Sequence, residues 1–268
     1  MVRLSDITCA GRASILQVSD TSPRFMSAAI SHDKIVVAFD LCSSSQIIED
    51  LLLSNRFDRY ETFLTCVKRW LMNWTEQHSE VNGHFELYKF TGDGWILLFP
   101  ATIRGKALIH SMHSLCEMIN AELDRHIIPS LSSQPSVLGA TLGVERGNLV
   151  RMMMNERAEY VGRALNVACR LQSVAREREP QAANEENVHG RCYKALVSAH
   201  LYNERLAQVN MPYRVESATS PLRNILSGSA FACRKIDFMV DGAGQALSWP
   251  SRETPGWTCA RSNWQGAP

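Results

Sequence analysis

Short apolar runs alternate along the chain with longer stretches in which apolar residues recur at helical spacing. The β-branched run at residues 34–41 predicts a buried strand that carries an acid, Asp40, near its end. Helical spacing at residues 47–74, interrupted near Ser54, predicts one or two helices. The fully apolar run at residues 95–99 is far shorter than the roughly 18 residues of a membrane helix, so we expect no membrane span.

Two hairpins and two further helices are expected in the middle of the chain. Each hairpin consists of two strand-like runs around a polar turn: residues 85–90 and 95–99 around 91–94 (TGDG), and residues 138–144 and 149–154 around 145–148 (ERGN). Helical spacing covers residues 104–127, where Pro129 ends the helix, and residues 161–175. After a polar linker at residues 177–187, weaker strand and helix signals alternate to Val240.

This order of elements predicts an α+β fold, in which helices pack on a mainly antiparallel sheet. We expect one domain at residues 31–245, preceded by a leader at residues 1–30 and followed by an irregular tail at residues 246–268. The tryptophans of this tail are expected to pack on the sheet or to extend an interface between two copies of the chain, because exposed tryptophans would promote aggregation.

Charge and cysteine content narrow the range of partners. Lys+Arg 28 against Asp+Glu 27 leaves a net charge of +1, so no global field recruits nucleic acid or an anionic membrane. The eight cysteines form no C-x-x-C pair and no secretory signal precedes them, which indicates reduced thiols and a cytoplasmic protein. The eight histidines, including His110 and His113, are expected to be surface or packing residues rather than metal ligands.

Two acids are the first candidates for chemistry. If the first hairpin pairs beside the first strand, Asp40 and Asp93 meet at one end of the sheet. Two carboxylates there would suit Mg²⁺ or Mn²⁺, although each acid alone also fits an ordinary turn or strand end. The run from Ser43 to Ser45 adds hydroxyl and amide donors, which serve either to hold a phosphate or to cap the next helix.

A polar stripe marks the last predicted helix. Arg163, Asn166 and Arg170 are spaced i, i+3 and i+7, so they share one helix face, while Leu165, Ala168 and Leu171 share an apolar face. Solvated helix faces usually mix both signs of charge, and this stripe contains no acid. The stripe therefore favours contact with an anionic ligand over a plain surface.

Together these features resemble the class III nucleotidyl cyclase catalytic domain over residues 34–225. The family's first metal motif is similar to the segment at 39–45 (FDLCSSS), and its K-x-x-G-D hairpin to the segment at 89–93 (KFTGD). Its D-x-x-G-x-x-V-N-x-A-x-R segment is similar to residues 159–170 (EYVGRALNVACR). The motifs occur in the family's order, and Leu142-Gly143-Val144 matches the strand of its usual second hairpin. No hydrolase nucleophile elbow, P-loop or zincin motif is present.

The resemblance implies a set of roles for the candidate residues. Asp40 and Asp93, with the Leu41 carbonyl, would bind two divalent cations, Mn²⁺ or Mg²⁺. The remaining residues would bind the nucleoside triphosphate. Asn166 would orient the ribose, Arg170 would contact the triphosphate, and Arg223 would hold the leaving phosphates at the position where the family usually has Lys. Ser44, Ser45 and Arg163 would contact other parts of the substrate. The two halves of each site would come from different protomers, so we expect a head-to-tail homodimer and an inactive monomer.

The residues expected to contact the base are Lys89 and Glu159, a donor and an acceptor that fit adenine, uracil or cytosine by polarity. Glu159 is one methylene longer than the family's usual Asp and leaves less space, which favours a pyrimidine. Ser44 also replaces the family's usual aromatic residue, and Arg163 replaces its usual Asp or Asn.

These departures resemble the stand-alone bacterial pyrimidine cyclases of Pycsar anti-phage defence. Such enzymes make cyclic UMP or cyclic CMP, which activates a separate effector that kills or arrests the infected cell. Lys89 and Glu159 do not distinguish UTP from CTP, since rotation of the two side chains lets them hydrogen-bond to either base. Two alternatives remain: an adenylyl cyclase for general cyclic AMP signalling, and a non-catalytic cyclase-homology dimer that binds nucleotides.

Overall fold

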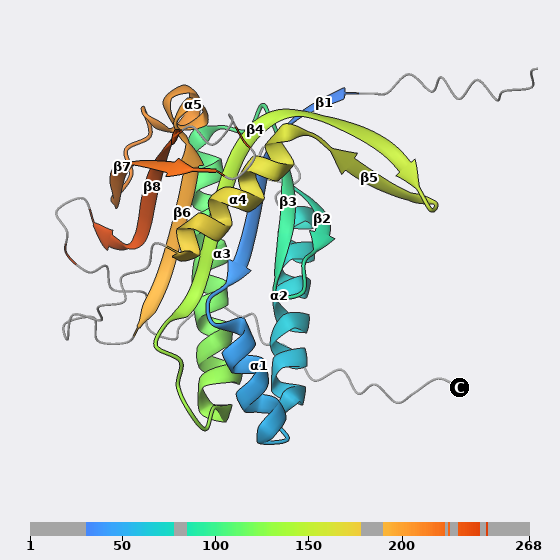
Figure 1. Cartoon of the computed structure of the whole chain (residues 1–268), viewed down its shortest axis with the longest axis vertical. Helices are drawn as coiled ribbons and strands as arrows, with labels where there is room; N and C mark the ends of the chain where they lie inside the picture. The colour runs from blue at the N-terminus through green and yellow to red at the C-terminus, as the bar shows by residue number, and fades with distance from the viewer. Residues whose placement is uncertain are drawn as a thin grey trace, which may run out of the picture.

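The computed structural model describes residues 31–77, 85–177, 190–222, 225, 230–241 and 245. Its strands form one sheet in the order β2-β3-β1-β4-β6-β8-β7, with β5 attached to β4, and helices cover the sheet (Figure 1). The β4–β6 pair is parallel and the other described pairs are antiparallel, which confirms the predicted α+β fold. The expected leader, the tail and nearly all of the linker lie outside the described residues.

The bounds of the elements follow the sequence pattern closely except at one hairpin. The strands are β1 (Ser31–Leu41), β2 (Glu86–Phe90), β3 (Gly94–Pro100), β4 (Leu138–Met154), β5 (Arg157–Val161), β6 (Arg191–Ser198), β7 (Tyr213–Pro221) and β8 (Ala230–Asp241). The helices are α1 (Ser44–Leu53), α2 (Phe57–Gln77), α3 (Gly105–Glu122), α4 (Arg163–Glu177) and α5 (Ala199–Leu201). Short π and 3-10 turns are η1 (Leu123–Ile127), η2 (Ile128–Ser130) and η3 (Tyr202–Leu206).

The predicted second hairpin at residues 138–154 is wrong, because this segment is one 17-residue strand, β4. The polar residues that suggested a turn are used by tertiary partners instead. Glu145 is buried and accepts a hydrogen bond of 2.8 Å from the Ser198 hydroxyl, while the Arg146 guanidinium pairs with Asp33 at 2.6 Å. The chain reverses later, at Asn155 and the residue after it, both of which have positive φ.

Both faces of strand β1 are covered, which explains its unbroken apolar sequence. Ile35, Val37 and Phe39 belong to the core shared with helices α1, α2 and α3. The alternate residues Val36 and Ala38 pack with helix α4 on the opposite face. Among the described residues, no helix combines the length and the apolar character needed to cross a membrane.

Candidate active site

The two predicted metal acids lie side by side at one end of the sheet. Strands β1 and β3 pair in a register that sets Asp40 opposite Gly94, so Asp93 immediately precedes the partner of Asp40. Gly94 permits this approach, since an added Cβ would lie 1.9 Å from the Phe39 carbonyl oxygen. Gly92 supplies the turn with a φ of 110°. The expected pairing of the first hairpin beside the first strand is therefore confirmed.

Helices α1 and α2 complete the surroundings of these acids. The Ser44 hydroxyl, buried at the start of α1, donates a hydrogen bond to Oδ2 of Asp93, whereas Ser45 is exposed. Tyr60 of α2 is buried, and its hydroxyl has no hydrogen-bond partner within the described part of the chain. Burial raises the pKa of Tyr60, and the negative charges of Asp93 and then Asp40 raise it further. Both carboxylates thus lie near the same tyrosine hydroxyl.

The predicted base-contacting pair is also brought together. Nζ of Lys89 on strand β2 lies 3.5 Å from Oε2 of Glu159 on strand β5, and both side chains remain partly exposed. The Tyr88 hydroxyl donates a 2.6 Å hydrogen bond to the same carboxylate oxygen. This hydrogen bond, and next to it the charge of Lys89, lower the pKa of Glu159, so the carboxylate is ionised at neutral pH and accepts hydrogen bonds.

Sequence reasoning did not identify Tyr88. Neighbouring residues of a regular strand point to opposite faces, yet Tyr88 and Lys89 both reach Glu159. The register of β2 against β3 shifts between Leu87 and Lys89, so Tyr88 is the additional residue of a β-bulge. A bulge of this kind depends on the partner strand, and the local sequence carries no signal for it.

Helix α4 presents the predicted polar stripe on its outer face. Arg163 and Asn166 are exposed and Arg170 is half-buried, whereas Ala168 on the inner face packs against the sheet. The helix lies very close to strand β4, because a Cβ added to Gly143 would be only 1.9 Å from the Ala168 carbonyl oxygen. The helix begins at Arg163 rather than at residue 161 as expected, since strand β5 extends to Val161.

Arg163 has one further contact. Its guanidinium carbon lies 5.9 Å from the ring centroid of Phe231 on strand β8, a distance typical of a cation–π contact. Arg223, the predicted contact of the leaving phosphates, lies outside the described residues. The described site therefore consists of three groups: the acids, the Lys89–Glu159 pair and the stripe on α4.

A scan against protein-family models and a search of curated proteins found no match. Solved structures with a similar fold include the adenylyl cyclase CyaB from P. aeruginosa, with 15% identity, a TM-score of 0.55, and coverage of 77% of this chain and 95% of that one. A guanylyl cyclase structure matches with 14% identity and a TM-score of 0.53 over 84% and 97% of the two chains. The chain has the class III cyclase fold.

A bacterial light-regulated adenylyl cyclase shares this cyclase fold at 15% identity and a TM-score of 0.54. The match covers 81% of this chain and 56% of that one, so the chain spans little more than half the length of the light-regulated protein. At identities of 14–15% these structures show the fold of this chain and not its reaction.

Proposed function

We propose that the protein is a pyrimidine nucleotide cyclase, which converts UTP or CTP to the 3′,5′-cyclic monophosphate and pyrophosphate. The observation that carries the proposal is the pairing of β1 with β3, which sets Asp40 and Asp93 side by side on a cyclase fold. Two adjacent carboxylates are the donor set that Mg²⁺ and Mn²⁺ prefer when they also bind substrate phosphates. The hydrogen bond from the Ser44 hydroxyl orients the Asp93 carboxylate and supports its assignment as a metal ligand.

Asp40, Asp93 and the Leu41 carbonyl would hold two divalent cations, Mn²⁺ or Mg²⁺. When bound, these ions would neutralise the triphosphate and lower the pKa of the ribose 3′-hydroxyl. The 3′-oxygen attacks the α-phosphorus in line, the bond from that phosphorus to the bridging oxygen breaks, and pyrophosphate leaves as the hydroxyl proton passes to solvent. In this reaction Asn166 orients the ribose and Arg170 stabilises negative charge on the phosphates.

Arg163, Ser45 and Arg223 are proposed as secondary phosphate contacts. The proposed enzyme is a head-to-tail homodimer in which one protomer supplies the two acids and its partner supplies the base-contacting pair and the stripe on α4. The exposure of Asn166 in a single chain supports this arrangement, because a ribose-orienting residue needs a second surface to enclose the substrate.

The Lys89–Glu159 pair supports a base with one acceptor and one donor. Lys89 would donate to O4 of uracil or N3 of cytosine, and the ionised Glu159 would accept from N3–H or the N4 amine. Tyr88 and Lys89 fix Oε2 of Glu159, so the longer side chain cannot easily fold back to enlarge the pocket. A smaller, pyrimidine base fits this restriction better than a purine.

The biological role that we propose is production of a second messenger in anti-phage defence. This proposal rests on the resemblance of the motif segments to the Pycsar cyclases. A separate effector would bind the cyclic nucleotide, and it need not contact the cyclase itself. The protein would act in the cytoplasm without nucleic acid or membrane partners.

Turnover of ATP, GTP, CTP and UTP, each labelled on the α-phosphate, tests the function directly. The purified chain is assayed with Mn²⁺ and with Mg²⁺, and products are separated and identified by mass spectrometry. Cyclic UMP or cyclic CMP as the main product is the expected result. Cyclic AMP as the main product would contradict the pyrimidine assignment and favour an adenylyl cyclase. Nucleotide binding without any cyclic product would favour the non-catalytic dimer.

A further inference from the structure

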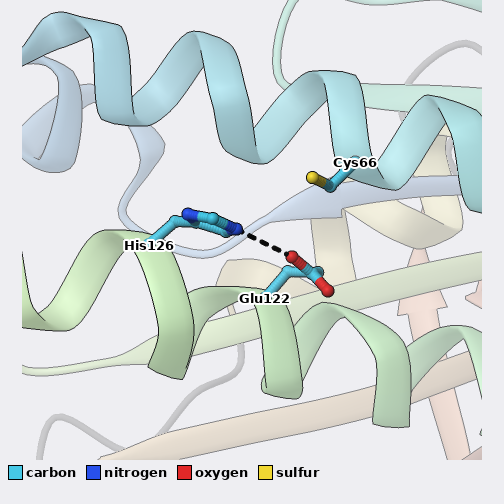
Figure 2. A group of neighbouring side chains, drawn as sticks. All are labelled: Cys66, Glu122 and His126. Carbon is cyan, nitrogen blue, oxygen red and sulfur yellow. Dashed lines mark ion pairs between the residues drawn. The ribbon is translucent and has the colours of Figure 1, made fainter. Parts of the chain in front are cut away.

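Three side chains with metal-binding chemistry meet between helix α2 and the end of helix α3. Cys66 comes from the middle of α2, Glu122 is the last residue of α3, and His126 lies in the π turn η1 that continues α3. Figure 2 shows the thiol facing the carboxylate and the imidazole across the gap between the two helices. One ligand atom from each residue lies within 4.8 Å of the other two.

The cluster is enclosed between the two helices. Cys66 is 6% exposed and Glu122 is 8% exposed. His126 Nε2 lies 3.1 Å from Glu122 Oε2, yet neither buried atom makes a well-directed hydrogen bond within the described part of the chain. The other carboxylate oxygen accepts a 2.8 Å hydrogen bond from Arg125. The imidazole and the carboxylate are thus held against each other beside the buried thiol, an arrangement of three donor atoms that one metal ion could bridge.

We propose that Cys66, Glu122 and His126 bind one transition-metal ion of the zinc type, with water as the fourth ligand. Zn²⁺ is bound by sulfur, nitrogen and carboxylate oxygen in tetrahedral geometry, which matches this set of donors. Thiolate and carboxylate together carry two negative charges, which favour a divalent cation, and Arg125 offsets part of the carboxylate charge. The hard ions Mg²⁺ and Ca²⁺ prefer all-oxygen sites and are not expected here.

The local backbone and the imidazole suit such a site. Tetrahedral Zn²⁺ ligands lie about 3.5 Å apart, so atoms now within 4.8 Å need only a small side-chain adjustment. His126 Nε2 lies 3.1 Å from Glu122 Oε2, so the imidazole already faces the carboxylate. Single π turns within helices are frequent at functional sites.

The site is independent of the proposed catalytic metals. It shares no residue with Asp40, Leu41 or Asp93, and its sulfur ligand selects a different class of ion. A bound ion would join α2 to the end of α3 and thereby fix two helices of the layer that covers one face of the sheet. Metal binding at His126 would depart from the expectation that the histidines are only surface or packing residues.

Metal binding by the full chain, without nucleotide, tests this site separately from any cyclase activity. The protein is stripped with a chelator and titrated with Zn²⁺ and Co²⁺. We expect one Zn²⁺ per chain and a Co²⁺ complex with visible bands of tetrahedral geometry and a near-ultraviolet thiolate-to-cobalt band. A chain that binds neither ion stoichiometrically, or a Co²⁺ complex without the thiolate band, would overturn the proposal.

Matched variants assign the ligands. Cys66→Ser and His126→Ala should each weaken Zn²⁺ binding at least about tenfold. Cys169→Ser removes a half-buried thiol elsewhere, and His113→Ala removes an imidazole that lies 3.7 Å from Glu117 on the same helix α3. Both controls should bind Zn²⁺ as the wild type does. Equal binding by the ligand variants and the wild type would refute the assignment.

Alkylation of the wild-type chain provides a second test if a ligand variant does not fold. The chain is treated with a thiol reagent at partly denaturing urea concentrations, with and without Zn²⁺, and modified cysteines are identified by mass spectrometry. Zn²⁺ should slow the modification of Cys66 at least as much as that of Cys116, which is buried on helix α3 outside the cluster and is protected only through the added stability of the fold. Modification of Cys66 at the same rate with and without Zn²⁺ would contradict the site.

Discussion

Replacement of Ser44 with alanine removes the hydroxyl that donates to the Asp93 carboxylate. Helix α1 loses no capping bond, because its N-cap residue is Ser43, whose side chain makes none. A hydrogen bond to a charged group contributes about 1.5–3 kcal/mol, and the lower end applies because Asp93 is only half-buried. At about 1.4 kcal/mol per factor of ten, kcat/KM at limiting metal should fall about tenfold.

The assay measures cyclization rate against Mn²⁺ concentration at a fixed concentration of the preferred nucleotide. Because Ser44 acts through a metal-binding carboxylate, the metal concentration for half-maximal rate should rise more than the KM for the nucleotide. The control is Ser111→Ala, which removes a buried hydroxyl that donates to the Ala107 carbonyl of its own helix at 3.0 Å. A folded Ser44→Ala protein with unchanged metal dependence would refute the positioning role.

Three further substitutions test other parts of the site. Asp93→Asn should abolish turnover while circular dichroism and dimerization stay unchanged; full activity would remove the metal assignment. Glu159→Asp should enlarge the base pocket and raise purine turnover relative to pyrimidine, and an unchanged ratio would mean that the base is recognised elsewhere. Gly143→Ala places a Cβ 1.9 Å from the Ala168 carbonyl oxygen, so urea unfolding should show a loss of about 1–3 kcal/mol; an unchanged midpoint would contradict the close packing of α4.

Local sequence patterns predicted those parts of the fold in which burial and periodicity agree. Strand β1 is apolar because both of its faces are covered, and the two helices α1 and α2 separate near Ser54, as expected from the interrupted spacing. The Gly-rich turn before strand β3 also matched, since Gly92 needs its positive φ there. These features depend on neighbours in the chain, so the sequence is sufficient to indicate them.

The errors and omissions all depend on contacts between distant segments. The polar segment at 145–148, with Gly147 and Asn148, is typical of a turn, but the Ser198 hydroxyl, 53 positions after Glu145, donates a hydrogen bond to the Glu145 carboxylate within the continuous strand β4. The bulge at Tyr88 forms through the register of β2 against β3. Cys66 and His126 are far apart in sequence and meet because two helices pack together, so no motif spacing indicates their cluster.

Strand β1 couples the two halves of the proposed cyclase site within each chain. Val36 and Ala38 of β1 pack against α4, and Asp40 lies near the end of the same strand. The same helix carries Asn166 and Arg170 on its outer face. The separation between the metal-binding half and the ribose-binding half of one chain is therefore set by the packing of α4 on β1 and β4. In a head-to-tail dimer each chain contributes one half to each of the two shared sites, so this distance determines the geometry of both. A substitution that shifts α4 should therefore reduce turnover even where every substrate-contacting residue is intact.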